Sequence, residues 1–165
     1  MYKVLITVAG SYVGESVRIY IWATSKEFDI DAVDTFDDYW KQADFSKYDV
    51  VYHVAGIAHV NADPKIEPLY YKVNRDLTIE IAKHAKAAGV KQFIFMSSMI
   101  VFHESQSLKT EMLTVDTKPN PNGFYGDSKL QAENGLHELE SPLFKVCILS
   151  PLWFMAQIQR GISYV

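Results

Sequence analysis

Short β-rich apolar runs alternate with helical patterns along nearly the whole chain, and this alternation constrains the fold more than any other feature. Strands are expected at 3–8, 28–34, 49–56, 91–98 and 144–150. Helices are expected at about 12–25, 68–88 and 124–139, with Gly89 ending the second. Strands that alternate with helices in this way are parallel and joined by right-handed crossovers. The sequence therefore predicts an open, doubly wound α/β sheet covered on both faces.

Length and composition narrow the class of protein. A chain of 165 residues, 48% apolar and 22% charged, is expected to form one soluble globular domain. The net charge of -4 gives no indication of a basic surface that would bind phosphates, so nucleic acid is not expected as a partner. The lone Cys147 lies in the apolar run FKVCIL, which predicts a buried, inert thiol and excludes an internal disulfide. No apolar run approaches a membrane span and no signal-peptide pattern is present, so we expect a cytoplasmic domain.

The stretch VLITVAGSYVG, residues 4–14, is an apolar strand that runs into a glycine-bearing turn before a helix. That context is typical of a dinucleotide-binding site. The helix N-terminus would offer free N–H groups and a positive dipole end to a pyrophosphate. The candidate cofactor residues of this turn are Gly10, Ser11, Tyr12, Val13 and Gly14.

Two further strand ends are candidates for the same site. Asp34 lies 20 residues beyond Gly14, where a carboxylate accepts both ribose hydroxyls and repels a 2′-phosphate, so NAD is favoured over NADP. Asp37 and Asp38 follow closely, so the assignment could shift to them, and a solvated acidic loop is the alternative reading. Ala55 and Gly56 end the third strand and could let the cofactor lie against the backbone; a plain strand-terminal glycine is the alternative.

A catalytic group is predicted at the start of the last helix. Tyr125 and Lys129 stand four apart, so both side chains lie on one helix face. A nearby ammonium favours the phenolate and would lower the pKa of the tyrosine toward that of a general base. Ser97 and Ser98 end the preceding strand, where a hydroxyl could bind the substrate oxygen beside Tyr125.

Four segments together resemble the extended short-chain dehydrogenase/reductases, specifically the NAD-dependent epimerase/dehydratases acting on nucleotide sugars. They are VLITxAGSYVG, YDVVYHVAGIAH, YYKVNRDLTIEIAKHAKAAGVKQFIFMSS and FYGDSKLQAE, within residues 1–149. The resemblance implies a Rossmann-type NAD(P)-binding domain over 1–149 and hydride transfer between a sugar carbon and nicotinamide. It implies a nucleotide-sugar substrate and no metal.

The resemblance also implies residue roles. Tyr125 matches the acid/base, and Lys129 matches the lysine that lowers the tyrosine pKa and holds the nicotinamide ribose. Ser98 matches the serine that hydrogen-bonds the sugar oxygen, and is preferred over Ser97 because it stands three before Val101 in SSMIV. Asn74 matches an asparagine near the active site, or is merely structural.

The chain departs from the family pattern at two motifs. Val8 stands where the family has a glycine, and its methyl groups would occupy space that the pyrophosphate or adenosine needs, which predicts impaired cofactor binding. The benign alternative is that Val8 simply extends the strand. Phe102 and His103 replace a tyrosine and a glycine of the family; His103 invites a general-base role, but an exposed histidine is the simpler reading.

The largest departure is the atypical tail, residues 150–165, where the family continues into a substrate domain. A nucleotide string for Pro-Leu-Trp-Phe-Met-Ala, residues 151–156, encodes Pro-Met-Val-Tyr-Gly in a shifted frame, which is the family continuation. We therefore hypothesise a frameshift near Ser150 and a chain that lacks the C-terminal substrate domain. The apolar tail residues either fill space where later strands would pack or form an exposed patch that drives association into a homodimer. They are Leu152, Trp153, Phe154 and Met155.

The sequence thus leaves two functions open. One is a nucleotide-sugar epimerase/dehydratase, weakened or inactive as this chain alone. The other is a non-catalytic nucleotide-binding or interaction module that kept the fold and lost the chemistry.

Overall fold

The computed structural model describes residues 1–7, 11–58, 64–102, 113–114 and 116–151. Five parallel strands form one sheet in the order β2-β1-β3-β4-β5. The strands are β1 (Tyr2–Thr7), β2 (Phe28–Val33), β3 (Val50–His53), β4 (Gln92–Met96) and β5 (Lys145–Leu149). This confirms the predicted doubly wound α/β sheet.

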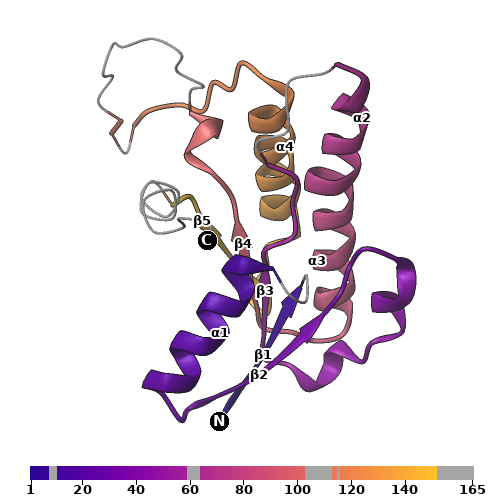
Figure 1. Cartoon of the computed structure of the whole chain (residues 1–165), viewed down its shortest axis with the longest axis vertical. Helices are drawn as coiled ribbons and strands as arrows, with labels where there is room; N and C mark the ends of the chain where they lie inside the picture. The colour runs from indigo at the N-terminus through magenta and orange to yellow at the C-terminus, as the bar shows by residue number, and fades with distance from the viewer. Residues whose placement is uncertain (8–10, 59–63, 103–112, 115, 152–165) are drawn as a thin grey trace, which may run out of the picture.

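The helices divide between the two faces of the sheet (Figure 1). Helix α1 (Tyr12–Thr24) lies on one face, and α3 (Thr78–Ala87) and α4 (Phe124–Leu139) pack together on the other. Helix α2 (Glu67–Tyr70) runs without a break through η4 (Tyr71–Leu77), a π-helical segment, into α3. The short 3₁₀ segments are η1 (Asp38–Gln42), η2 (Phe45–Lys47), η3 (Pro64–Ile66) and η5 (Met99–Val101).

The main core lies between the sheet and the α3–α4 layer. The inward side chains of β3 and β4 alternate along the strands, and Val51, Phe93 and Phe95 are fully buried against Ile81 and Leu136. Burying side chains of this size stabilises a domain by roughly 1.5–3 kcal/mol each. This layer therefore holds α3 and α4 rigidly against the carboxyl ends of β3 and β4.

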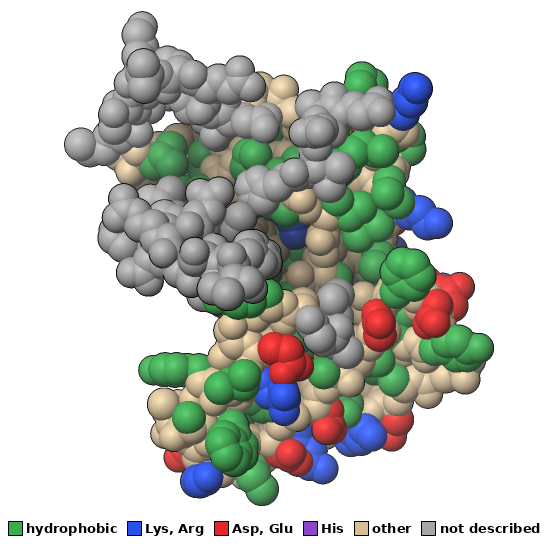
Figure 2. Space-filling view, in the orientation of Figure 1, with side chains coloured by type: hydrophobic (Ala, Val, Ile, Leu, Met, Phe, Trp, Pro, Cys, Tyr) green, Lys and Arg blue, Asp and Glu red, His purple; other side chains and the backbone are tan. Residues whose placement is uncertain are grey.

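The opposite face carries a smaller core. Val4, Ile6 and Tyr52 are buried there, with Val17 of α1 packed against them. Farther along the sheet, Cys147 is only half-buried, so the prediction of a buried thiol is wrong. Strand β2 is mostly exposed and lies at the edge of the sheet. Acidic and basic side chains are interspersed on the lower half of the view in Figure 2, where β2 and α1 lie.

The ends of the helices and strands follow from local residue types. Gly89 adopts φ +86 and its N–H donates to the carbonyl of Lys86, which ends α3 as expected of a glycine after a helix. The predicted helix at 124–139 has the observed bounds, whereas the predicted strand at 49–56 ends at His53. The three residues beyond His53 lie outside β3, and Gly56 among them approaches Lys129 and Asn74 of the site described next.

Candidate functional site

The strand order defines where a ligand can bind. From β1 the chain crosses to β2 on one side, and from β2 it returns past β1 to β3 on the other. At such a switch point the connections diverge and leave a crevice outside the carboxyl ends of the two strands. Thr7 and His53, the last residues of β1 and β3, are paired partners at that point. The predicted site residues that the structure describes follow these strand ends or lie on helices beside them.

The turn before α1 prepares a helix N-terminus. Ser11 is the N-cap, and its Oγ accepts a hydrogen bond from the N–H of Gly14 at 3.1 Å. The N–H groups of Tyr12 and Val13, like the first ones of any α-helix, have no acceptor inside the helix. They are therefore the donors that the turn can offer to an anion. Val8, Gly10 and His103 lie outside the described residues.

Gly14 permits a close approach of helix and sheet. A Cβ at this position would lie 2.7 Å from Ser11 Oγ and 3.0 Å from Ile6 Cγ2. The same Cβ would lie 3.6 Å from Val54 Cγ2, which is an ordinary van der Waals contact. Only a residue without Cβ keeps both the N-cap and the packing of α1 against β1, which agrees with the place of Gly14 in the predicted turn.

Asp34 stands directly after β2, exposed at the carboxyl edge of the sheet. Its Oδ1 accepts from the N–H of Phe36 at 2.9 Å, which orients the carboxylate at the strand end. The neighbouring carboxylates are engaged differently: Asp37 caps η1 and Asp38 pairs with Lys41 at 3.0 Å. The geometry therefore favours Asp34 over its neighbours as the ribose-binding candidate.

Asn74 fixes the backbone after β3. It is fully buried on the π-helical segment, and its Oδ1 accepts from the N–H of Ile57 at 2.8 Å while its Nδ2 donates to the Ile57 carbonyl at 3.1 Å. The same Nδ2 donates to Ser128 Oγ on α4 at 3.1 Å. Asn74 thereby ties the loop carrying Ala55 and Gly56 to α4.

Ser98 and Tyr125 come together across the site. Ser98 is the N-cap of η5, and its hydroxyl also forms a hydrogen bond with the Tyr125 side chain. Gly126 allows this approach, because a Cβ there would lie 2.9 Å from the carbonyl oxygen of Ile100. The structure thus brings together the serine and tyrosine that the sequence singled out.

Burial raises the pKa of Tyr125, and the hydrogen bond with Ser98 only partly opposes it. The sequence led us to expect the opposite direction, a tyrosine pKa lowered by Lys129. Burial disfavours the phenolate, since a charged oxygen loses its hydration. In this structure burial has a larger effect on the pKa of Tyr125 than the hydrogen bond with Ser98.

Lys129 points from α4 toward the end of β4. Its Nζ donates to the carbonyl oxygen of Met96 at 2.9 Å and lies 4.5 Å from the centre of the Phe95 ring. Gly56 leaves room for it, since a Cβ on Gly56 would lie 3.0 Å from Nζ. Burial lowers the pKa of Lys129 to about 8. Lys129, Gly56 and Asn74 therefore meet at one place above the sheet.

A buried histidine at this site was missed by sequence reasoning. His53 Nδ1 lies 2.7 Å from Thr7 Oγ1, and its Nε2 lies 2.9 Å from Thr78 Oγ1. The hydroxyl of Thr78 donates to the Asn74 carbonyl, so it accepts from a protonated Nε2, and Thr7 donates to Nδ1. Burial lowers the pKa of His53 to about 3, which keeps the ring neutral. A histidine inside the run VVYHVAG gave no pattern by which to find this network.

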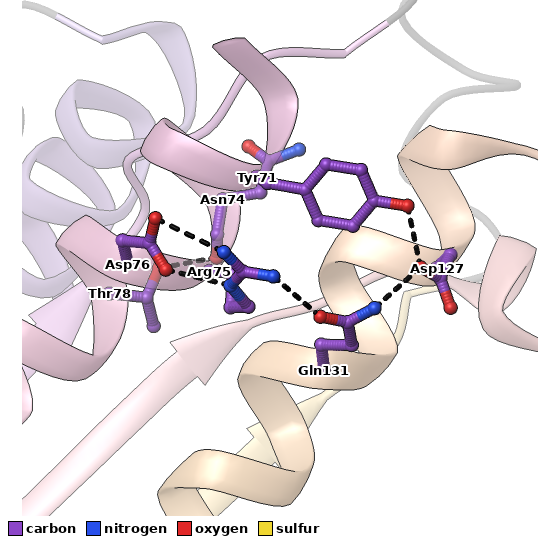
Figure 3. Close-up of polar contacts among 7 residues, drawn as sticks. All are labelled: Tyr71, Asn74, Arg75, Asp76, Thr78, Asp127 and Gln131. Atoms are coloured by element: carbon purple, nitrogen blue, oxygen red, sulfur yellow. Dashed lines mark hydrogen bonds and ion pairs between the residues drawn. The ribbon is translucent and has the colours of Figure 1, made fainter. Parts of the chain in front are cut away.

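An outer network fastens the π-helical segment to α4 (Figure 3). Tyr71 donates its hydroxyl to Asp127 Oδ2 at 2.7 Å, and Gln131 Nε2 donates to the same oxygen at 2.6 Å. Arg75 Nη1 donates to Gln131 Oε1 at 2.8 Å, and its Nε donates to Asp76 Oδ1 at 2.7 Å. Because the two elements are joined on this side, Asn74 and Tyr125 keep fixed relative positions.

Comparison with known proteins decides the family. The sequence profile of the NAD dependent epimerase/dehydratase family matches residues 4–153, nearly the whole chain. The chain belongs to this family. The expected NAD-dependent class is thereby confirmed, and NAD is the family's cofactor.

Sequence relatives of this epimerase-family chain agree. It is 40% identical to the UDP-glucose 4-epimerase of Vibrio cholerae over 105 residues, which is 62% of this chain and 32% of that protein. It is 32% identical to the UDP-glucose 4-epimerase of Homo sapiens over 133 residues, which is 79% of this chain and 37% of that protein. The chain thus spans about a third of the length of these curated relatives.

Solved structures show the same fold. The UDP-Glc/GlcNAc 4-epimerase of Campylobacter jejuni matches 91% of this chain and 53% of its own with a TM-score of 0.74 and 23% identity. The UDP-glucuronic acid 4-epimerase of Bacillus cereus in complex with NAD matches 90% of this chain and 55% of its own, with a TM-score of 0.72 and 21% identity. These likenesses confirm the Rossmann-type fold of the family.

The described residues fit the family's cofactor. Ser11 caps the N-terminus of α1, and a Cβ on Gly14 would clash with that cap. Asp34 stands at the end of β2, and Gly56, in the segment after β3, has no side chain to displace Lys129. Within the described part of the chain, no group of three or more His, Cys, Asp or Glu could hold a metal ion. None of the helices described has the length and apolar character that crossing a membrane requires.

Proposed function

We propose that this chain is the cofactor-binding and proton-transferring part of an NAD-dependent nucleotide-sugar epimerase/dehydratase. The observation that carries the proposal is the contact between Ser98 and Tyr125, with buried Lys129 one helical turn away at the switch point of the sheet. The named activities of the relatives support a nucleotide sugar as the substrate.

In this proposal NAD, when bound, supplies the hydride acceptor. The first-turn N–H groups of Tyr12 and Val13 bind its pyrophosphate. The Asp34 carboxylate accepts the ribose hydroxyls, and the backbone at Ala55 and Gly56 lies against the cofactor. Asn74 holds that backbone in place through Ile57.

Tyr125 is the acid/base of the proposed reaction. Its phenolate takes the proton of a sugar hydroxyl, while the hydrogen atom on the carbon that bears this hydroxyl leaves as a hydride. Ser98 hydrogen-bonds the sugar oxygen and holds it beside Tyr125. The positive charge of Lys129 favours the phenolate against the burial that opposes it, and the same ammonium binds a ribose hydroxyl.

A second function is a non-catalytic nucleotide-binding module, and two observations favour it. Lys129 donates to the Met96 carbonyl, and the pKa of Tyr125 is raised rather than lowered. A site that only binds the nucleotide needs the glycine turn and Asp34, but not an ionised tyrosine.

Reduction of NAD by a UDP-sugar separates the two functions. The chain is incubated with NAD and UDP-glucose, and the absorbance of reduced nicotinamide is followed. We expect slow reduction, abolished in Tyr125→Phe, with NAD affinity equal in both proteins. Tyr39→Phe, at an exposed tyrosine, serves as the matched control. Equal reduction by Tyr125→Phe would contradict the assigned role, and NAD binding with no reduction in either protein would support the module.

The domain division remains a proposal. We infer that 1–149 is the NAD(P)-binding domain and that 150–165 is an atypical tail produced by a frameshift. Residues 152–165 lie outside the described residues. Reading the gene tests the idea: an alternative frame that encodes no substrate domain downstream would contradict it.

We also infer a cytoplasmic location, because the lone Cys147 needs no oxidising compartment.

We further propose that the chain associates into a homodimer. Sedimentation of the purified chain measures it directly, and a monomer at all concentrations would contradict it.

A further inference from the structure

The two serines that directly follow β4 reach different partners. Ser98 contacts Tyr125, whereas the hydroxyl of Ser97 donates to Glu133 Oε1 on α4. Successive residues of an extended strand point to opposite sides, which explains the divergence. Ser97 is also anchored by its backbone, since its N–H donates to the Leu149 carbonyl at 2.7 Å and it is only 5% exposed. It therefore presents its hydroxyl to Glu133 from a fixed position.

Glu133 follows Lys129 by four residues on α4, so the two side chains lie on the same helix face. Lys129 is 4% exposed, and its ammonium carries three donors. The Met96 carbonyl and the Phe95 ring are neutral partners. An ammonium buried to this extent is costly unless a counter-charge is near.

The charged and titratable groups around the pair are few within the described residues. On α4, Glu133 attracts Lys129 and raises its pKa against the larger effect of burial. From β3, His53 faces Lys129 and is neutral. Glu133 itself is affected by Ser97 from β4 and by Lys129 and His137 on its own helix, all of which favour its ionised form against burial.

We propose that Glu133, held in place by Ser97, is the counter-charge of Lys129 and keeps its ammonium charged and positioned at the carboxyl end of β4. Glu133 acts through Lys129 and is therefore a positioning residue. This inference rests on the proposed function for its purpose, because the proposed reaction needs that positive charge beside Tyr125.

Titration of Lys129 tests the inference without cofactor or substrate. The chain is labelled with lysine carrying ¹³C at Cε, the Lys129 signal is assigned with Lys129→Arg, and its shift is followed against pH. Glu133→Gln keeps an oxygen acceptor for Ser97 but removes the charge. We expect the titration midpoint of Lys129 to fall by about 1 pH unit, because the carboxylate one helical turn away no longer stabilises the ammonium. Glu138→Gln, exposed on the same helix, should leave the midpoint unchanged.

Ser97→Ala is the second variant and carries the test if Glu133→Gln does not fold. It leaves the carboxylate but frees its orientation, so the midpoint should fall by a smaller amount in the same direction. A Lys129 midpoint in Glu133→Gln equal to that in Glu138→Gln would overturn the inference, and so would an unchanged midpoint in Ser97→Ala. Because the readout needs no NAD, loss of NAD binding would count against the proposed function and not against this pair.

Discussion

The Nζ atom of Lys129 donates a hydrogen bond to the carbonyl oxygen of Met96, 2.9 Å away. The contact joins the middle of α4 to the last residue of β4, so the ammonium is positioned by the sheet as well as by its own helix. Burial lowers the pKa of Lys129 to about 8, which leaves the group charged at neutral pH but close to its titration range. A small change in its surroundings therefore changes its charge.

Gly14→Ala should destabilise the chain. The added Cβ would lie 2.7 Å from Ser11 Oγ and 3.0 Å from Ile6 Cγ2, so either the N-cap or the packing of α1 must give way. Overpacking of this kind costs ~1–3 kcal/mol. Urea denaturation measures the loss, and Tyr20→Ala, exposed on the same helix, should change the free energy of unfolding by less than ~0.5 kcal/mol. Equal stability of Gly14→Ala and the unmodified chain would show that residue 14 accepts a Cβ without loss of the N-cap or of the helix packing.

His53 should make the chain less stable in acid. Its pKa is lowered from 6.5 to about 3, so below pH 6.5 the unfolded chain binds a proton that the folded chain does not. The stability contribution is complete above pH 6.5 and is lost as the pH falls toward 3. In this window His53→Gln should reduce the slope of unfolding free energy against pH by up to ~1.4 kcal/mol per unit. Identical slopes for the two proteins would mean that His53 is not held neutral.

The fold could be predicted from the sequence because its signals are local. The apolar runs ending at Thr7, His53 and Met96 and the helix stop at Gly89 each depend on neighbouring residues. The π-helical segment around Asn74 could not be predicted, since an extra residue per turn barely disturbs the apolar spacing of a long helix.

The site could be predicted only in part. Ser98, Tyr125, Lys129 and Asn74 were found through motifs, and the structure brings them to one edge of the sheet. The partners of Ser97 and His53 were not found, because Glu133 lies 36 residues from Ser97 and Thr7 lies 46 residues from His53. The direction of the Tyr125 pKa also depends on burial, which the motif does not encode.

Asp34→Asn should weaken discrimination between the two nicotinamide dinucleotides. Removing the carboxylate removes its repulsion of a 2′-phosphate, so NADP affinity should rise relative to NAD by roughly tenfold, about 1.4 kcal/mol. Calorimetric titration with each dinucleotide gives the ratio. Asp37→Asn and Asp38→Asn are the matched controls, since those carboxylates cap η1 and pair with Lys41. A ratio that changes in a control and not in Asp34→Asn would move the assignment to that residue.

Val8→Gly should tighten NAD binding. Valine stands here where the family pattern has a glycine, and a β-branched side chain at that motif position is expected to compete with the pyrophosphate for space. Restoring glycine should lower the dissociation constant at least roughly tenfold, which corresponds to about 1.4 kcal/mol. Val17→Ala, a β-branched residue of α1 away from the turn, serves as the control. Unchanged affinity in Val8→Gly would sink the idea that this valine impairs the site.

The central claim is that the carboxyl ends of β1, β2 and β3 bind NAD. NAD is titrated into the ¹⁵N-labelled, unmodified chain, and the backbone amide signals are followed by NMR. We predict saturable shifts of the amides of Tyr12, Gly14 and Gly56, with those of Tyr39 and Glu138 unmoved. The claim is contradicted if a folded chain shows no saturable shift at Tyr12, Gly14 and Gly56, or if the shifted amides lie elsewhere on the sheet.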